Sequence, residues 1–257
     1  MHFSTLLSNI PIRSQATDNA TQIDELLFGE VVESLEINGA WSRVKNAVTH
    51  TQGYVLTKQL LSVDAAYAEM FAQGKLKRLF YPIATAENER SSIRQYLPGG
   101  ALLQLHKDKL KIGGELFSLP EPFPQINHQK KEDILRDAAL LYLNVPEKKG
   151  GRTIFGMDPT LFLTHVFSFA DMYSGNTLDE MALLGEGVNF VHEMQCGDIA
   201  FFEDQNQIIV HAGICIGESW IMHADGKVKS GRLDQQGLFD PKENKYIHKL
   251  RLIKRYI

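Results

Sequence analysis

The chain has 257 residues, of which 44% are hydrophobic and 23% charged, and its formal net charge is −4. These values are typical of a globular protein with one large domain or two to three small ones. The net negative charge gives no general attraction to nucleic acid, so no nucleic-acid partner is expected. With only Cys196 and Cys215, the chain lacks the cysteines of a disulfide scaffold and the paired Cys and His spacings of a zinc site, and we expect no metal and no cofactor.

The N-terminal segment has no positively charged start and no apolar run of the length found in a signal peptide. Ser4, Ser8 and Asn9 interrupt its apolar residues. No other apolar stretch approaches the roughly 18 residues that a membrane-spanning helix needs. We therefore expect a cytoplasmic protein that does not interact with a membrane.

Residues 1–62 have the pattern of a small all-β unit. Two alternating runs at 30–37 and 41–45 flank Asn38-Gly39, which is a strong signal for a β-hairpin. A further run at 53–56 would complete a unit of the size of an SH3-like barrel. The order of the motifs PIRS, LLFGE, WSRVK and KQL around this hairpin resembles the bacterial SH3 domain that precedes many cell-wall peptidases.

Residues 63–127 are predicted to form a second SH3-like unit and a linker. A polar, helical segment at 64–73 precedes short apolar runs separated by glycines. Pro120, Pro122 and Pro124 indicate a stiff linker, because proline resists both helix and sheet. A domain boundary near residue 127 follows.

Residues 128–257 are predicted to form an α+β domain, with helices first and an antiparallel sheet after them. Apolar residues at helical spacing predict an amphipathic helix over 131–143. A second helix should begin after Asp158, a favoured N-cap, with Pro159 at its first position. Apolar runs predict strands at 198–202, 208–216, 219–224 and 250–253.

Four motifs in this segment together resemble the NlpC family of papain-like murein peptidases: GGRTIFGMD, CGDIAFFED, HAGICIG and IMHADGKVKSGRLD. The resemblance implies a papain-like fold, a general base at His211 and an orienting residue at His223. Its active members with this domain order are γ-D-glutamyl-L-diamino acid endopeptidases, whose Cys nucleophile directly follows the residue that matches Asp158. At such a helix N-terminus, backbone N–H groups lower the thiol pKa.

The position of that nucleophile is occupied here by Pro159, which has no ionisable group. Thr160 has a hydroxyl, but it lies one residue further on, on another side of the helix, and lacks the reactivity of a thiol. The sequence therefore predicts a catalytically inactive relative of the cysteine endopeptidases. Pro159, His211 and His223 would be the remnant of its catalytic site.

Other departures affect positions that would bind substrate. Lys149 stands where relatives have an aromatic residue before two glycines, and 178–181 replace a subsite motif that begins Arg-Asp-Ser. In the first SH3-like unit, Tyr54 ends the segment that matches a Tyr-x-Gly-Trp motif. The candidate cleft-lining residues are Asp158, Thr160, Lys149 and Tyr54.

His211 and His223 could also have a role that is unrelated to catalysis. Because both lie in apolar runs, they could be hydrogen-bonded core histidines kept from an active ancestor. A His pair can also bind a metal, but no further ligand at a recognisable spacing supports such a site.

The sequence leaves three functions open. The first is a binding or regulatory module that contacts murein peptides or a paralogous peptidase. The second is an active murein-peptide hydrolase with an unrecognised nucleophile, and the third is a structural interaction protein built on the SH3-like units. Affinity for murein peptides separates the first from the third, and turnover isolates the second.

Overall fold

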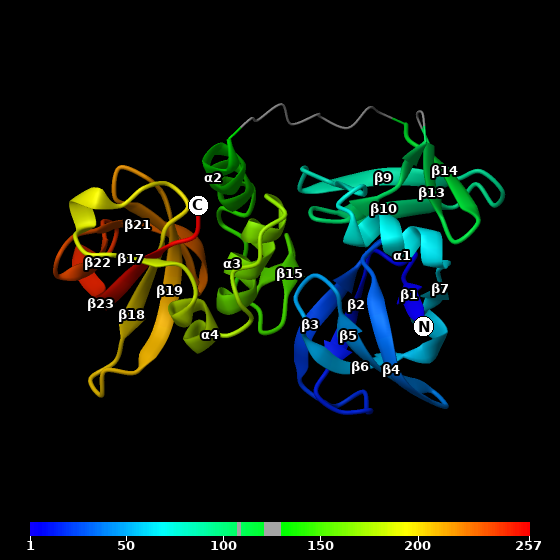
Figure 1. Ribbon diagram of the computed structural model, residues 1–257, viewed down its shortest axis with the longest axis horizontal. Coiled ribbons are helices and arrows are strands. Elements are labelled where there is room, and N and C mark those ends of the chain that lie inside the picture. The colour runs from blue at the N-terminus through cyan, green and yellow to red at the C-terminus, as the bar shows by residue number, and fades with distance from the viewer. Residues whose placement is uncertain (107–108, 121–129) are drawn as a thin grey trace. The chain divides into compact units, whose positions relative to one another are not determined.

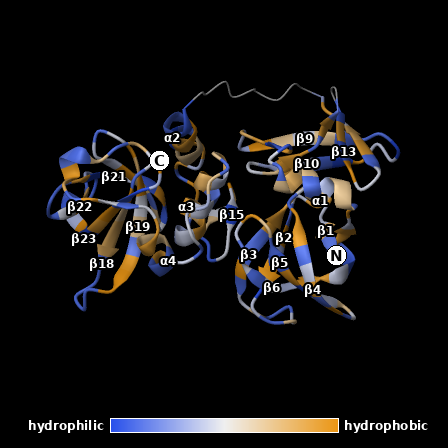
Figure 2. Ribbon diagram, viewed as in Figure 1, coloured by the Kyte–Doolittle hydropathy of each residue, from blue (hydrophilic) through white to orange (hydrophobic). Residues whose placement is uncertain are grey.

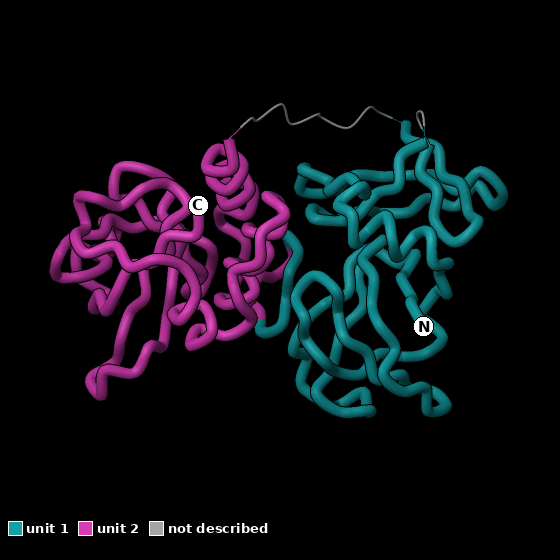
Figure 3. The backbone as a smooth tube through the Cα atoms, viewed as in Figure 1, with its two compact units in different colours: residues 1–126, 149–154 teal, residues 127–148, 155–257 magenta. Residues whose placement is uncertain are grey.

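The computed structural model describes residues 1–106, 109–120 and 130–257. The chain divides into two compact units, shown in teal and magenta in Figure 3. Unit 1 contains residues 1–126 and 149–154, and unit 2 contains residues 127–148 and 155–257. In the part of the chain that is described, no helix has the length and apolar character needed to span a membrane.

Unit 1 begins with a seven-stranded antiparallel sheet in the order β3-β2-β6-β5-β4-β1-β7 (Figure 1). Its elements are β1 (His2–Ser4), β2 (Asn9–Arg13), β3 (Gln22–Leu27), β4 (Val32–Asn38), β5 (Trp41–Asn46), β6 (Gln52–Leu56), the 3-10 helix η1 (Thr57–Gln59) and β7 (Leu61–Ser62). Its buried core consists of Ile10, Ile12, Leu26, Val32, Val44 and Val55. Because successive side chains in a strand point to opposite faces, alternate residues of β2 and β5 are buried.

The predicted hairpin is present between β4 and β5, and its turn is displaced by one residue. Asn38 pairs with Trp41, so the two loop residues are Gly39 and Ala40 rather than Asn38 and Gly39. Gly39 has a φ of 59°, a backbone conformation that glycine adopts without a steric penalty. A glycine at the first loop position is typical of a type II′ hairpin turn, which matches the twist of the strands.

The remainder of unit 1 is also mostly β. Its elements are α1 (Ala65–Ala72), β8 (Lys77–Arg78), β9 (Ile83–Asn88), β10 (Arg94–Pro98), β11 (Leu102–Leu103), β12 (Leu105–His106), β13 (Lys109–Ile112), β14 (Glu115–Ser118) and, after the return of the chain at 149–154, β15 (Arg152–Thr153). Asp64 caps α1 by accepting a hydrogen bond from the Tyr67 backbone N–H, which confirms the helix predicted at 64–73. Strands β10-β9-β14-β13-β12 form one sheet, and β11 pairs with β8.

Residues 149–154 belong to unit 1 although their neighbours in sequence belong to unit 2. Arg152 is fully buried there, with Nε 2.7 Å from Asp24 Oδ1 and Nη2 2.6 Å from Glu30 Oε2. Its backbone N–H donates to Glu25 Oε2 at 2.8 Å. Unit 1 therefore contains a buried arginine that is paired with two carboxylates.

The described residues of unit 2 form three helices, a short 3-10 helix and a barrel with short additional strands. Its elements are α2 (Lys131–Leu141), β16 (Gly156–Met157), α3 (Pro159–Ser168), α4 (Leu178–Leu183), β17 (Glu186–Val188), η2 (Val191–Glu193), β18 (Ile199–Glu203), β19 (Ile209–Gly217), β20 (Trp220–Asp225), β21 (Lys227–Leu233), β22 (Gly237–Asp240) and β23 (Lys245–Arg255). The strand order is β17-β23-β18-β19-β20-β21-β22, and β22 also pairs with β23. Six strands, β18 to β23, therefore close into a barrel, and Figure 2 shows apolar residues along strands such as β18.

The barrel closes because β23 is 11 residues long. Its first half pairs with β22, its middle and second half pair with β18, and its end pairs with β17. The helices and the strands predicted after residue 197 are confirmed, although β23 begins five residues before the predicted run at 250–253. Strands β17, β21 and β22 were not predicted, because they are short or carry many polar residues.

The division into domains at 1–62, 63–127 and 128–257, and the SH3 identity of the first two, remain predictions. The first seven-stranded sheet ends at Ser62, and both predicted SH3-like segments lie in unit 1. Pro122, Pro124 and the boundary near residue 127 lie outside the described residues.

Candidate functional site

The helix predicted after Asp158 is present, and it begins at Pro159 as expected. Asp158 is its N-cap, and Asp158 Oδ1 accepts hydrogen bonds from the backbone N–H groups of Thr160 at 3.0 Å and Leu161 at 3.2 Å. Pro159 fits the first position because its fixed φ suits a helix and its missing N–H would have no partner within the helix. Asp158, Pro159 and Thr160 are all partly exposed.

Helix α3 packs against β19 and β20, the two strands that carry the predicted catalytic histidines. Its side chains from Leu161 to Ser168 are all buried, which holds the helix firmly in the core of unit 2. The start of α3 and the strand that carries His211 therefore belong to one packed core.

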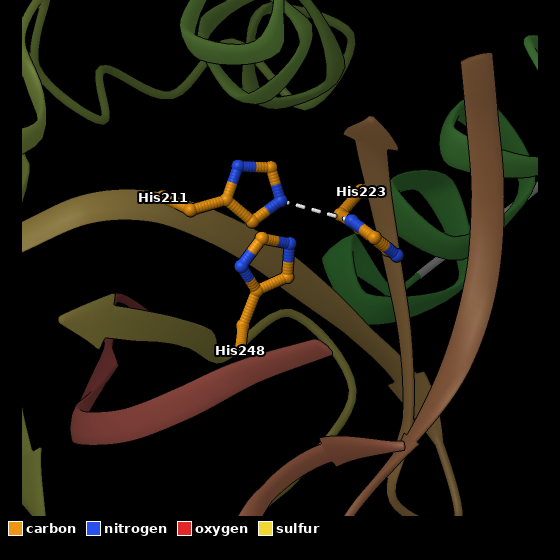
Figure 4. A group of neighbouring side chains, drawn as sticks. All are labelled: His211, His223 and His248. Carbon is orange, nitrogen blue, oxygen red and sulfur yellow. Dashed lines mark hydrogen bonds between the residues drawn. The ribbon is translucent and has the colours of Figure 1, made fainter. Parts of the chain in front are cut away.

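His211 and His223 lie together in the structure, as the resemblance implied. His211 is on β19 and 8% exposed, and His223 is on β20 and fully buried. His211 Nε2 lies 2.9 Å from His223 Nδ1, a hydrogen-bond distance, and the ring planes are 82° apart (Figure 4). His223 is thus placed to orient the His211 ring, in the way that a third catalytic residue orients a base.

A third histidine, His248 on β23, lies beside His211 and His223 and was not predicted as a site residue. Its ring stacks on the His211 ring, with centroids 4.2 Å apart and planes 23° apart. One ligand nitrogen from each of His211, His223 and His248 lies within 4.8 Å of the others. Figure 4 shows that the three rings come from three strands and face one another. We refer to these three residues as the histidine cluster.

Burial keeps the histidine cluster uncharged. Burial, together with the neighbouring His248 and His223, lowers the pKa of His211 to about 3. The pKa of His223 is likewise lowered to about 3 by burial and then by His248 and Lys229. Burial also lowers the pKa of His248, although the Asp225 carboxylate opposes this shift. All three imidazoles are therefore neutral at neutral pH.

Two nitrogens of the cluster are buried without a hydrogen-bond partner among the described residues. They are His223 Nε2 and His248 Nε2. Asp225 Oδ2 is 3.8 Å from His248 Nε2, which is longer than a hydrogen bond. Buried polar atoms are usually paired, so two unpaired nitrogens in one cluster are an unusual feature of this site.

Neither cysteine supplies a replacement nucleophile. Cys215 is in the core of the barrel, and burial raises the pKa of its thiol to about 11. Burial also raises the pKa of Cys196 to about 11, and its Sγ donates to the Glu132 carbonyl oxygen at 3.2 Å. Both groups are thiols at neutral pH, and the thiolate is the reactive form.

The remaining candidate residues are divided between the two units. Asp158 and Thr160 are in unit 2 with the histidine cluster, whereas Tyr54 on β6 and the exposed Lys149 are in unit 1. The cleft-lining role of Tyr54 and Lys149 stays a prediction.

Comparison with known proteins agrees with this architecture. Residues 146–249 match the NlpC/P60 family. No curated protein matches the chain. Among solved structures, an NlpC/P60 family protein from Bacillus cereus ATCC 10987 is similar over 100% of this chain and 99% of its own, with a TM-score of 0.78 and 16% identity.

Two further structures are similar at lower scores. An NlpC/P60 endopeptidase from Photobacterium damselae subsp. piscicida covers 98% of this chain with 65% of its own, at a TM-score of 0.67 and 16% identity. NlpC2 from Trichomonas vaginalis covers 99% of this chain with 98% of its own, at a TM-score of 0.51 and 14% identity. Identities this low establish a shared fold. Together with the family match, they show that residues 146–249 of this chain form an NlpC/P60 family domain.

Proposed function

We propose that this NlpC/P60 domain is a catalytically inactive relative of the γ-D-glutamyl-L-diamino acid cysteine endopeptidases, and that it acts as a binding or regulatory module. Its ligand would be a murein peptide or a paralogous peptidase. The observation that carries the proposal is Pro159 at the first position of α3, where the resemblance places the nucleophile.

The backbone around Pro159 supports this proposal as strongly as its side chain does. A peptidase must stabilise the oxyanion of its tetrahedral intermediate, commonly with backbone N–H groups. Pro159 has no N–H, and those of Thr160 and Leu161 donate to Asp158. The first three positions of α3 therefore offer no free backbone donor to an oxyanion.

The histidines also have unsuitable acidity for general-base catalysis. An efficient base has a pKa near the working pH, because it must be deprotonated and still attract a proton strongly. Burial lowers the pKa of His211 to about 3, so this imidazole is a weak base. The site thus lacks a nucleophile, its histidine is a weak base, and the start of α3 has no free donor for an oxyanion. These three features favour binding over cleavage.

The test combines turnover and binding on the same preparation. The L-Ala-γ-D-Glu-diamino acid tripeptide would be incubated with this protein and, in a separate positive control, with an active NlpC/P60 endopeptidase. The products of each reaction would be separated by chromatography. Loss of a nucleophile typically lowers the rate by about a million-fold, so no cleavage is expected. Calorimetric titration of the same peptide should show binding.

Two results would contradict the proposal. Cleavage that His211→Ala abolishes would show an active hydrolase. Absence of binding to both the murein tripeptide and an immobilised active paralogue would exclude the binding role and leave a structural one.

A further inference from the structure

The histidine cluster has a geometry that the proposed binding function does not use. His211, His223 and His248 come from β19, β20 and β23; His211 and His223 turn ring nitrogens toward each other, and the His248 ring stacks on the His211 ring (Figure 4). Their ligand atoms all lie within 4.8 Å of one another. We propose that His211, His223 and His248 bind a divalent transition metal ion, with zinc as the best chemical match.

The distance between His211 and His223 is close to that of a metal site, and the His248 ring, which stacks on the His211 ring, would turn to bring a nitrogen to the same ion. In a tetrahedral zinc site with Zn–N bonds of about 2.0–2.1 Å, the ligand nitrogens are about 3.3 Å apart. His211 Nε2 and His223 Nδ1 are 2.9 Å apart, so an ion between them requires the two rings to separate by only a few tenths of an ångström. Neutral imidazole carries its proton on either nitrogen, and each ring can therefore present a lone pair to the ion.

The unpaired nitrogens are the second observation that points to a ligand. His223 is fully buried and its Nε2 has no hydrogen-bond partner among the described residues, and His248 Nε2 is likewise buried without one. Leaving a buried polar atom unsatisfied costs free energy, and coordination of His248 by an ion would remove one of these penalties.

The donor set selects the class of metal. Three imidazoles suit zinc, copper and nickel, whereas magnesium and calcium prefer oxygen ligands. A carboxylate is also close, because Asp225 Oδ2 lies 3.8 Å from His248 Nε2. Asp225 could provide a fourth ligand or orient the His248 ring, as carboxylates commonly do for metal-bound histidines.

The test uses the full chain without a polyhistidine tag, after treatment with a chelator and its removal. Titration with zinc chloride in a calorimeter should show one equivalent bound. Cobalt(II) should give visible absorption bands of a four-coordinate ion with nitrogen ligands. His248→Phe keeps a stacked ring but removes a ligand, and we expect more than about a 100-fold loss of affinity, since even partners outside the ligand shell contribute 10–100-fold.

His192→Ala is the matched control, because His192 is a histidine of the same unit outside the cluster and should leave the affinity unchanged. His223→Ala provides a second test, and circular dichroism would check its fold. Should that variant not fold, His248→Phe and the cobalt spectrum still decide the question. Absence of stoichiometric zinc binding, or affinity in His248→Phe equal to that of the unchanged protein, would overturn the proposal. Neither titration contains a peptide, so the result is independent of the proposed function.

Discussion

Each unit of this protein buries a cluster of polar side chains, and the two clusters differ in how fully their atoms are paired. In unit 1, Arg152 donates to Asp24, Glu30 and the Glu25 backbone, and Asn46 and Thr49 donate to Asp24 as well. In unit 2, the three histidines form one hydrogen bond among themselves, between His211 and His223, and two of their nitrogens have no hydrogen-bond partner among the described residues.

This difference separates a structural cluster from a candidate functional one. A buried charge is tolerated only when it is paired and hydrogen-bonded. Burial alone would lower the pKa of Arg152, but the charges of Asp24 and Glu30 raise it well above its usual value, so the guanidinium stays charged. Neutral imidazoles need no charge partner, so burying their unpaired nitrogens costs less than burying an unpaired charge, and these nitrogens remain available to a ligand.

The largest expected effect is on the stability of unit 1. Arg152→Met leaves the buried Asp24 and Glu30 carboxylates without their cation, and we expect the free energy of unfolding to fall by about 3–5 kcal/mol. The protein has two tryptophans, Trp41 in unit 1 and Trp220 in unit 2. Urea unfolding followed by fluorescence in a Trp220→Phe background therefore reports on unit 1.

Two further variants sharpen this result. Arg43→Met removes an exposed arginine from the sheet that carries Asp24 and should change the stability by no more than about 0.5 kcal/mol. Adding Glu30→Gln to Arg152→Met should restore part of the loss, because one unpaired charge is removed. Equal stability of Arg152→Met and Arg43→Met would mean that the buried ion pairs do not hold this unit together.

A smaller effect is expected at the start of α3. Asp158→Ala removes the acceptor for the Thr160 and Leu161 N–H groups and should cost about 1 kcal/mol. Asp158→Asn should preserve most of this stability, because Asn is also a favoured N-cap. The measurement follows Trp220 fluorescence in a Trp41→Phe background. A loss in Asp158→Asn as large as in Asp158→Ala would show that charge rather than capping is responsible.

Local signals predicted much of the fold. The hairpin at Gly39, the cap at Asp64 and the start of α3 at Asp158 all depend on residues within a few positions of one another. The closure of the barrel could not be predicted in this way. It depends on the register of β23 against β22 and β18, which follows from long-range packing rather than from any local pattern.

The same distinction applies to the candidate site. The resemblance identified His211 and His223 because they lie in family motifs, and the structure brings them together. His248 was missed because it lies on the final strand, before the apolar run at 250–253, and only barrel closure brings it to the other two. The network of Arg152 was missed for a similar reason, since Asp24 is 128 positions away in sequence.

A substitution in the histidine cluster should change the free energy of unfolding of the metal-free protein only slightly. His248→Phe keeps the ring shape and removes an Nε2 that has no hydrogen-bond partner, so in the presence of a chelator we expect a change below about 1.5 kcal/mol. Leu238 is a buried core residue that pairs with His248 across β22 and β23. Leu238→Ala should lower the free energy of unfolding by about 2–5 kcal/mol and serves as a positive control for the measurement. A loss in His248→Phe as large as in Leu238→Ala would make the histidine cluster a structural element like the Arg152 network.

The smallest expected effect concerns Pro159→Cys. We expect this variant to show no detectable peptide hydrolysis. The new thiol would lie at a helix N-terminus, where the helix dipole lowers its pKa below about 8.5, and it should react with iodoacetamide at neutral pH. The unchanged protein is the control, because burial raises the thiol pKa of both Cys196 and Cys215 to about 11. Peptide hydrolysis should not return. Met181 lies at the position of a substrate-binding motif in relatives, but it is buried in the core. Poor positioning of a substrate alone can remove several kcal/mol of rate enhancement. Efficient cleavage of the L-Ala-γ-D-Glu-diamino acid tripeptide by Pro159→Cys would instead show that a single substitution silenced an otherwise intact peptidase site.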